Sequence, residues 1–439
     1  MKEDLDRYLE EAGLDGLLVL GPAAHNPAMT YFTGPVHVGW GALALRRGGE
    51  GILYASDMER EEVARTGYPF GRLDFAAYAQ EAGGDPQEVM AIALERILRQ
   101  ADLTGRIQVA GLVDAGATLT QFRRLVRRLP GLTVVEFDPA QSPLHRARST
   151  KDAQEVERIR RMGEITVEVV GRVADFLASQ SARQGFLTDR QGRPLTVGEV
   201  KRRINLWLMQ LGAENPEGTI FAIGRDAGVP HNPGADERPI PVGQPMIFDI
   251  FPCEIGGGYF YDFTRTWCVG HAPDAVATAH AQVVAAYNAA LPLTRSGATG
   301  RDVQRAVCEF FEERGHKTVM TDPQTQEGYV HSIGHGLGLE VHEHPNFRLL
   351  HEPPDVLEAG HVVTIEPGLY YPERGFGVRV EDTVWIGPDG PQVLAPYPMD
   401  LVLPLRRSLR APAKSAPRKS TRGTKKAKPR PVRRTRGGG

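Results

Sequence analysis

Apolar positions in the first third of the chain fall into short runs separated by stretches of helical spacing. Leu5 and Leu9 lie on one face of a predicted first helix, which ends near Gly13. Residues 16–20 form an apolar run closed by a Gly-Pro pair, which predicts a buried strand. This order indicates an α/β domain over residues 1–145, in which no catalytic cluster is evident. Its other predicted elements are strands at 42–45 and 51–54 and helices at 86–100 and 119–128.

A second pattern follows residues 137–143, which contain two prolines and predict a linker because proline breaks regular structure. Apolar side chains then recur at helical spacing over residues 152–177. Thr299 resembles a helix N-cap ahead of an apolar stripe that ends at Gly315. Between and after these helices the sequence is strand-like. Nearly all the candidate chemistry lies there, in a second domain predicted over residues 146–405.

Four acidic residues interrupt the apolar and aromatic runs of this second domain. Asp249 lies in one run and Asp262 in the next, and the glycines at 256–258 between them predict a hairpin turn. Glu366 and Glu381 lie in two later strand-like segments. One such acid would most often mark a turn or a strand end. An ionised carboxylate among apolar neighbours is costly unless a cation or several donors meet it, so the four together predict a bound cation.

A histidine-rich segment lies between the two pairs of acids, with His331, His335 and His342 spaced along it. Four carboxylates and one imidazole offer mostly hard oxygen ligands. Such a set suits a pair of Mn-, Co- or Zn-like ions rather than a closed structural zinc site. The strand period of two also predicts that Arg379 shares a face with Glu381.

Four sequence elements in this order resemble those of the pita-bread metallopeptidases, specifically the branch of aminopeptidase P and prolidase. They are Gly-Tyr-x-x-Asp-x-Thr-Arg-Thr from residue 258, His-x-x-Gly-His-Gly-Leu-Gly from 331, Thr-x-Glu-Pro-Gly from 364 and Val-Arg-x-Glu-Asp from 378. Each alone is a weak signal, whereas the set is specific. The match covers roughly residues 145–405. The resemblance implies an α/β N-terminal creatinase-like domain followed by an α+β pita-bread catalytic domain.

The resemblance also implies which residues bind two divalent metal ions. Asp249 would bind the first ion, and His335 and Glu366 would bind the second. Asp262 and Glu381 would bridge the two ions. Manganese is the first expectation, and cobalt and zinc stay open.

The matched substrate residues surround this set. Glu366 would accept the proton of the attacking water as well as bind metal. His231 and His342 would donate to the oxyanion or to the neighbouring carbonyl. His331 and Arg379 would shape the substrate site.

Each of these side chains taken alone has a simpler structural interpretation. His231 and His342 could cap backbone groups, and His331 could satisfy a carbonyl. Arg379 could be the salt-bridge partner of Asp382 or of the adjacent Glu381.

One spacing departs from the family pattern. The two aspartates of the family are eleven residues apart, whereas Asp249 and Asp262 are thirteen apart. Two extra residues therefore fall within 250–257, where a longer glycine-containing turn would absorb them without moving the acids. Glu254 is a competing first ligand, disfavoured because it lies beside the predicted turn.

Charge separates the chain into a body and a tail. Residues 406–439 hold fourteen of the 52 Lys and Arg and no acid, which leaves 38 basic against 54 acidic residues, or −16, in the rest. With few apolar side chains, the tail is predicted to be disordered. A body this acidic would repel nucleic acid, whereas the tail could contact it.

Other composition features favour a cytoplasmic protein. Three cysteines without CxxC spacing argue against a disulfide framework and fit a reducing compartment. Neither a signal peptide nor an apolar run long enough to cross a membrane is expected. A homodimer is the expected assembly.

The leading hypothesis is a proline-specific metallopeptidase that hydrolyses the bond between an N-terminal residue and a following proline. An aminopeptidase acting on peptides is favoured over a dipeptide-specific prolidase, although the segment 346–348 beside the site does not decide between them. The alternative from another class is a non-catalytic pita-bread protein that docks on nucleic acid through its basic tail. A metal-free hydrolase of the creatinase type is a third possibility, disfavoured because all five metal-ligand residues are present.

Overall fold

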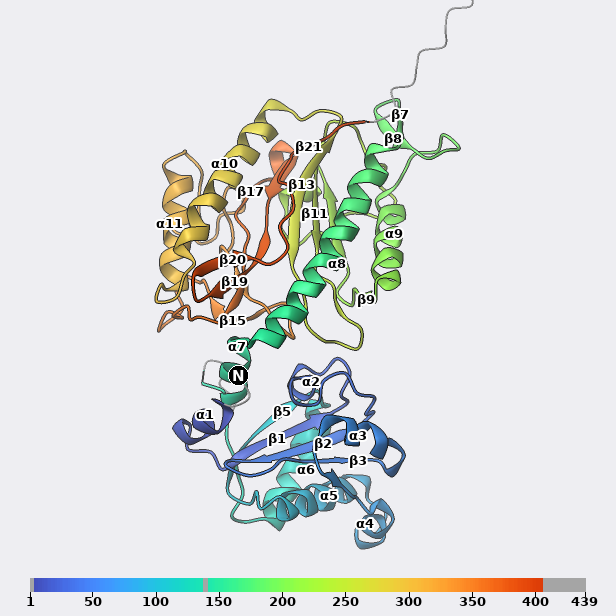
Figure 1. Cartoon of the computed structure of the whole chain (residues 1–439), viewed down its shortest axis with the longest axis vertical. Helices are drawn as coiled ribbons and strands as arrows, with labels where there is room; N and C mark the ends of the chain where they lie inside the picture. The colour runs from blue at the N-terminus through green and yellow to red at the C-terminus, as the bar shows by residue number, and fades with distance from the viewer. Residues whose placement is uncertain (1–3, 137–140, 406–439) are drawn as a thin grey trace, which may run out of the picture.

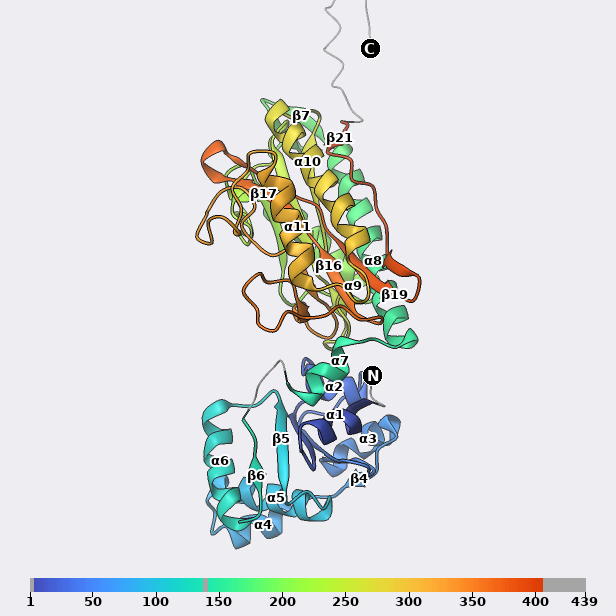
Figure 2. The same ribbon diagram turned by 90° about the vertical axis from the view of Figure 1, so that its left-hand side faces the viewer.

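The computed structural model describes residues 4–136 and 141–405, which form two α/β units along the long axis of the molecule (Figure 1). Helix α7 (Pro143–Ser149) lies between the units in two perpendicular views (Figures 1 and 2). The boundary predicted at residue 145 falls inside this helix. The predicted tail and part of the predicted linker lie outside the described residues and stay predictions. No helix in the described ranges is long and apolar enough to cross a membrane.

The first unit is built on a six-stranded sheet with the order β4-β3-β2-β1-β5-β6. Its central strand β1 pairs antiparallel with β2 and parallel with β5, and all six of its residues are buried. The strands are β1 Gly16–Gly21, β2 Gly41–Arg46, β3 Ile52–Ala55, β4 Phe70–Gly71, β5 Arg106–Gly111 and β6 Thr133–Val134. The helices are α1 Leu5–Glu11, α2 Pro27–Thr33, α3 Arg60–Thr66, α4 Phe75–Glu81, α5 Pro86–Gln100 and α6 Ala115–Arg128.

Most elements predicted for this unit are present, but α6 begins four residues earlier than expected. The Asp114 side chain accepts a hydrogen bond from the Ala117 backbone N–H at 2.7 Å and so caps the helix there. An aspartate cap satisfies a backbone donor that the first turn leaves free. The pattern of apolar residues did not predict this start, because the first turn of α6 is marked by its polar N-cap residue.

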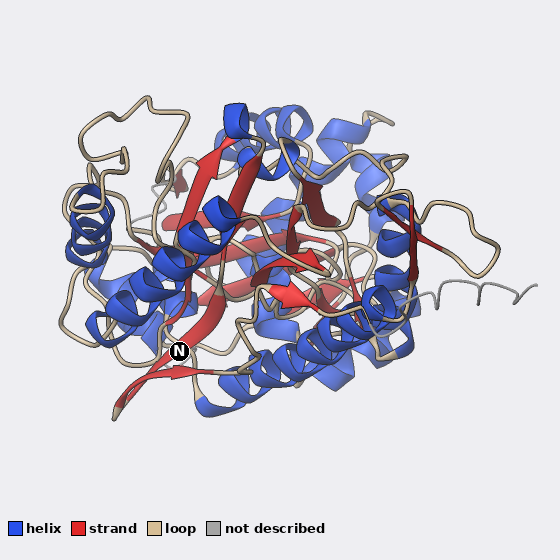
Figure 3. Cartoon of the chain, turned by 90° about the horizontal axis from the view of Figure 1, so that it is seen from above, coloured by secondary structure: helices blue, strands red, loops and turns tan. Residues whose placement is uncertain are grey.

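The second unit places two antiparallel-rich sheets between pairs of helices. Figure 1 shows α8 and α9 on one side of the strands and α10 and α11 on the other, and Figure 3 shows the same enclosure from above. One sheet has the order β10-β11-β13-β21 and the other β15-β14-β16-β19-β20. The helices are α8 Ala153–Ala178, α9 Val197–Gln210, α10 Asp274–Ala290 and α11 Gly300–Glu312.

The strands of this unit carry the predicted chemistry at their ends. Those of the two sheets are β10 Thr219–Ile223, β11 Pro245–Ile250, β13 Phe263–Val269, β14 His335–Gly336, β15 Glu343–Asn346, β16 Val362–Ile365, β19 Asp382–Gly387, β20 Gly390–Val393 and β21 Val402–Leu403. Three two-stranded pairs complete the unit: β7 Ser181–Arg183 with β8 Phe186–Thr188, β9 Ala213–Glu214 with β12 Cys253–Glu254, and β17 Gly368–Tyr371 with β18 Phe376–Arg379.

The long helix α8 links the packing of the two units. Asp152 and Glu155 form a reciprocal capping box that fixes its start. Its apolar face belongs to a core cluster that also contains Leu9 of α1 and Leu144 of α7. The apolar core is therefore continuous across the junction between the units.

Candidate metal centre

The hairpin of β11 and β13 brings the first two predicted acids together. Asp249 pairs with Thr264 across the hairpin, and Asp262 directly precedes β13. Both aspartates are buried, and one oxygen of each, Oδ1, has no hydrogen-bond partner among the described residues. Buried polar atoms without a partner are rare in folded proteins and indicate a missing ion or water.

The connection between these strands is longer than a tight turn. It contains the short strand β12, and Gly256 and Gly257 have φ angles of 90° and 83°, which favour glycine. Glu254 forms a two-pronged ion pair with Arg158 at 3.0 and 2.6 Å and accepts a hydrogen bond from the Tyr259 backbone N–H. This pairing engages Glu254 with α8, which removes the reason to consider it a metal ligand.

The second sheet positions the other two acids. Ile365 of β16 pairs with Asp382 of β19, so that Glu366 and Glu381 lie at the same end of this ladder. The Glu381 backbone N–H donates to the Thr264 carbonyl at 3.0 Å, which joins the two sheets at the acids.

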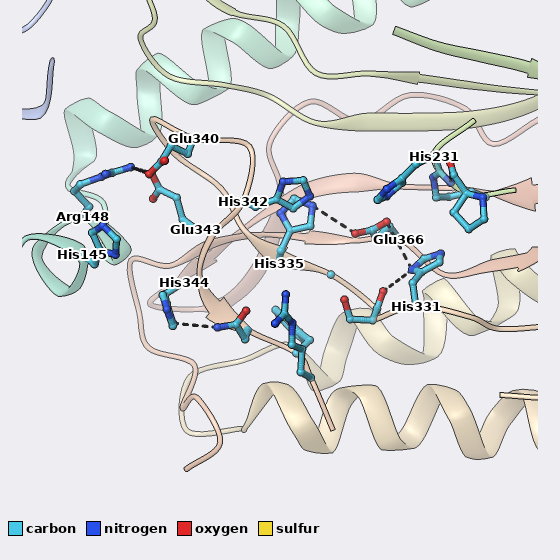
Figure 4. Close-up of a pocket in the computed structure, with 17 residues that line it drawn as sticks. His145, Arg148, His231, His331, His335, Glu340, His342, Glu343, His344 and Glu366 are labelled. Atoms are coloured by element: carbon cyan, nitrogen blue, oxygen red, sulfur yellow. Dashed lines mark hydrogen bonds and ion pairs between the residues drawn. The ribbon is translucent and has the colours of Figure 1, made fainter. Parts of the chain in front are cut away.

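The side chains of these two sheets converge on one point. Single ligand atoms of Asp262, His335 and Glu381 all lie within 4.8 Å of one another. His335 Nε2 lies 3.6 Å from Asp262 Oδ2. It also lies 3.4 Å from Glu366 Oε1 (Figure 4). Its Nδ1 is 3.0 Å from the Gly336 carbonyl, to which it donates. Nε2 is then the free acceptor on the side of the acids, as a metal ligand requires.

Arg379 contacts a different acid from those expected. Its Nη2 lies 2.5 Å from Asp249 Oδ2, whereas Asp382 pairs with Arg265 at 2.8 Å. The interpretation of Arg379 as a salt-bridge partner of Asp382 or Glu381 is therefore wrong. The reason is that β18 ends at Arg379 and β19 begins at Asp382, so the strand period does not continue through this segment.

Burial sets the protonation of this cluster. It raises the pKa of Asp262 and of Glu381 well above their usual values, and that of Glu366 to about 8. Neighbouring carboxylates add to the rise in each case. Burial also lowers the pKa of His335 to about 3, which keeps its imidazole neutral. Converging acids that favour protons in the absence of a cation, together with a neutral imidazole, fit a divalent metal ion.

A cavity of about 590 Å³ opens beside the cluster, and His231, His331, His342, Glu366 and Arg379 all line it (Figure 4). A second cavity of about 550 Å³ shares most of these residues and reaches Asp249, Asp262 and Glu381. The structure thus brings together all nine predicted site residues. His231 and His342 are exposed, and the His342 ring lies 4.3 Å from that of His335.

Both ring nitrogens of His331 contact other groups of the protein. Nδ1 lies 2.7 Å from the Ser332 carbonyl and Nε2 lies 2.8 Å from the Tyr370 hydroxyl. Arg379 Nη1 in turn donates to that hydroxyl at 2.8 Å. The expectation that His331 satisfies a backbone carbonyl is confirmed, and the same ring also helps to fix Arg379.

Tyr370 is a site residue that the sequence reasoning missed. It is fully buried, and its hydroxyl connects Arg379 with His331. In the sequence Tyr370 is marked only by its position four residues after Glu366. It lies in β17, and the pairing of this strand with β18 was not predicted.

Comparisons with known proteins agree with this architecture. The sequence model of Metallopeptidase family M24 matches residues 157–388, and that of the Creatinase/Prolidase N-terminal domain matches residues 2–150. A curated relative, an Xaa-Pro dipeptidase of Pyrococcus furiosus, is 25% identical over 406 residues, which cover 92% of this chain and 100% of that protein.

Two solved structures share the fold. An X-Pro aminopeptidase from Thermotoga maritima has a TM-score of 0.69 at 22% identity, covering 92% of this chain and 99% of that chain. A prolidase from Pyrococcus furiosus has a TM-score of 0.66 at 23% identity, covering 90% and 99%. The predicted order of a creatinase-like domain and a pita-bread domain is confirmed.

Proposed function

The chain belongs to metallopeptidase family M24, and from this premise we propose that it hydrolyses the bond between an N-terminal residue and a following proline. Membership makes it a peptidase that works with divalent metal ions. The proline preference is supported by the relatives, which include Xaa-Pro dipeptidases and an X-Pro aminopeptidase. The observation that carries the proposal is the cluster of Asp262, His335 and Glu381, with Asp249 and Glu366 beside it, next to a histidine-lined cavity.

We assign the metal-binding role to the five residues at the point where the two sheets meet. They are Asp249, Asp262, His335, Glu366 and Glu381. Two divalent ions, manganese first, would supply Lewis acidity and lower the pKa of an attacking water towards neutrality. The orphaned oxygens of the two aspartates support this assignment.

The remaining side chains would handle protons and orient the substrate. Glu366 borders the cavity and, once ionised, is the base best placed to take a proton from water. His231 and His342 are exposed to the cavity and would donate to the oxygen that becomes negative. His331 has no free ring nitrogen, so its part is to hold Tyr370 and Arg379 in place.

One observation favours a dipeptidase as the second candidate. Arg348 lines the same cavity, is exposed and forms no ion pair within the part of the chain that the structure describes. A free guanidinium at this wall would hold the carboxylate of a dipeptide. The sequence favoured the aminopeptidase. A dipeptidase would need Arg348 to bind its substrate, whereas an aminopeptidase would not.

The test is an assay of the purified protein on Ala-Pro, on Ala-Pro-Ala-Ala and on the matched peptides with Ala at the second position. Chelation should abolish cleavage and Mn²⁺ or Co²⁺ should restore it, with the proline peptides strongly preferred. Full activity in a sample shown to be metal-free, or equal rates on the alanine peptides, would contradict the proposal.

Arg348→Ala separates the two candidates. For a dipeptidase it should raise the KM for Ala-Pro by roughly 10- to 100-fold, the effect of losing one hydrogen bond between charged groups. For an aminopeptidase, cleavage of Ala-Pro-Ala-Ala should exceed that of Ala-Pro and the substitution should change neither greatly.

A further inference from the structure

Glu343, directly after His342, is the most heavily hydrogen-bonded acid near the cavity. Its carboxylate accepts from the backbone N–H groups of Leu339 and Glu340 at 2.9 and 3.2 Å. Arg148 donates to it at 2.5 Å and Lys151 at 3.0 Å. The Glu343 side chain is only 7% exposed.

Both cations come from the segment that joins the two units. Arg148 lies on α7, and Lys151 lies between α7 and α8. The α7 helix is itself fastened to the first unit, since the Tyr31 hydroxyl of α2 donates to the Ala147 carbonyl at 3.0 Å. Figure 4 shows Arg148 and Glu343 together at one end of the cavity, away from His331 and His231.

The Glu343 carboxylate is ionised at neutral pH. Burial alone would raise the pKa of Glu343, but Arg148 and Lys151 outweigh it and hold the pKa at about 2. A carboxylate that stays ionised throughout the working range cannot exchange protons with a substrate. Its contribution must therefore come through the groups that it holds.

The backbone N–H groups that donate to Glu343 belong to the loop between His335 and His342. The loop leaves His335, folds its backbone amides over the Glu343 carboxylate and ends on His342. It packs closely, because a Cβ on Gly338 would lie 2.5 Å from a Glu343 oxygen. The direction of the His342 ring thus depends on where the carboxylate is anchored.

We propose that Glu343 is the positioning residue for His342, and that Arg148 and Lys151 make this positioning depend on the junction between the two units. The inference rests on the proposed function in one respect, the contact of His342 with substrate. It adds a role for the first unit, which supplies no side chain to the acidic cluster within the described residues.

The test is a double-mutant cycle measured on the full-length protein loaded with Mn²⁺. His342→Ala alone should lower kcat roughly 10- to 1,000-fold, the range for losing one transition-state donor. Glu343→Gln alone keeps the shape of the side chain and should lower kcat about 10-fold or more, with KM and metal content little changed. In the His342→Ala background, Glu343→Gln should cause no further loss, because it acts through the missing ring.

Two further variants complete the cycle. Lys151→Met removes one of the two charges that hold the Glu343 carboxylate and keeps most of the apolar part of the side chain. It should lower kcat in the same way as Glu343→Gln, and it replaces that variant in the test if Glu343→Gln fails to fold. Glu340→Gln is the matched control. It removes the negative charge of the half-exposed side chain that also pairs with Arg148, but it leaves both backbone N–H groups that donate to Glu343 in place. It should change kcat less than about twofold.

The outcomes are distinguishable. An equal loss on Glu343→Gln in both backgrounds, or loss of metal with kcat, would overturn the positioning role and leave the proposed function intact. An unchanged kcat in His342→Ala would instead overturn the substrate role of His342, and the positioning role with it.

Discussion

Asp249 and Asp262 each keep one buried carboxylate oxygen without a donor among the residues that the structure describes, at a cost of roughly 1–3 kcal/mol for each atom. Arg379 forms an ion pair with Asp249, and among the described residues no Lys or Arg forms an ion pair with Asp262, Glu366 or Glu381. Nothing in the apolar packing compensates for this. A divalent cation would satisfy the orphaned oxygens and the charge together, which is the residue-level case for a metal centre.

Glu366 should be the most sensitive position of the cluster. Glu366→Gln removes both a charged ligand and the proposed base, so kcat should fall by roughly 10²- to 10⁴-fold or more. The measurement is turnover of an Xaa-Pro peptide with metal content determined on the same sample. Glu313→Gln, a change of the same kind at an exposed acid, should retain the parent rate. Turnover near the parent rate in Glu366→Gln would remove this residue from the mechanism.

The protonation of Glu366 also predicts how metal binding responds to pH. Burial raises its pKa to about 8, with Arg379 opposing the rise and Asp249 adding to it. Below pH 8 the metal-free group is mostly protonated, whereas a cation binds the ionised form. Mn²⁺ binding should therefore release protons, tighten as pH rises from about 6 to about 8 and level off above that. Calorimetric titration in buffers of different ionisation enthalpy measures the release. Binding that is independent of pH would contradict the assignment.

At the scale of elements, the hairpin between β11 and β13 does more than present two acids. Its turn reaches the first unit, where the His25 backbone N–H donates to the Gly256 carbonyl at 2.8 Å. The Glu214 carboxylate accepts from the backbone N–H groups of Gly256 and Gly257 at 3.1 and 2.9 Å. The two extra residues of this connection thus belong to a contact between the units, and the acids stay in register on the strands.

Two neighbouring glycines of this turn isolate the contact. Both have positive φ, so an alanine at either should cost roughly 1 kcal/mol of unfolding free energy. A Cβ on Gly257 would also lie 2.6 Å from the His25 backbone, whereas a Cβ on Gly256 would meet nothing within 4 Å. Gly257→Ala should therefore lower the melting temperature more than Gly256→Ala, with little change in metal content in either. Equal losses of stability would show that the contact with His25 contributes nothing.

At the scale of the whole molecule, the first unit is fastened to the second at three kinds of contact. One apolar core cluster runs from α1 through α7 to α8. The hairpin turn meets His25, and the α7 segment holds Glu343 through two cations. Two of these contacts end on loops that carry proposed metal or substrate residues. The homodimer and the cytoplasmic location have no such support and stay predictions.

The basic segment 406–439 lies outside the described residues, so its prediction rests on charge alone. Deleting it should leave the rate on a small Xaa-Pro peptide nearly unchanged, because the segment has few apolar side chains with which to pack. The same deletion should abolish any salt-sensitive retention on a nucleic-acid column, since the remaining −16 body repels phosphate. Turnover and retention are measured with and without the segment. A large loss of peptidase activity would show that the segment belongs to the catalytic unit.

Local patterns in the sequence determined the main elements and the site residues. Apolar spacing predicted β1, α5 and α8, because hydrophobic periodicity depends only on neighbours along the chain. The four motifs contain six of the nine predicted site residues, and the segments around Asp249, His231 and His342 supply the other three; the structure brings all nine around one cluster and its cavity. Acids embedded in apolar strands gave this signal because their burial needs a cation, whatever the fold around them.

Tertiary structure alone decided how these residues are held. Arg379 pairs with Asp249, which lies 130 positions away, and Arg148 with Glu343, which lies 195 positions away. Glu254 forms an ion pair with Arg158, and the pairing of β17 with β18 places Tyr370 beside Arg379 in the site. Periodicity and motif spacing carry no information on which distant charges meet across sheets and units. That choice follows from packing, because only the folded chain determines which buried charges are close enough to compensate one another.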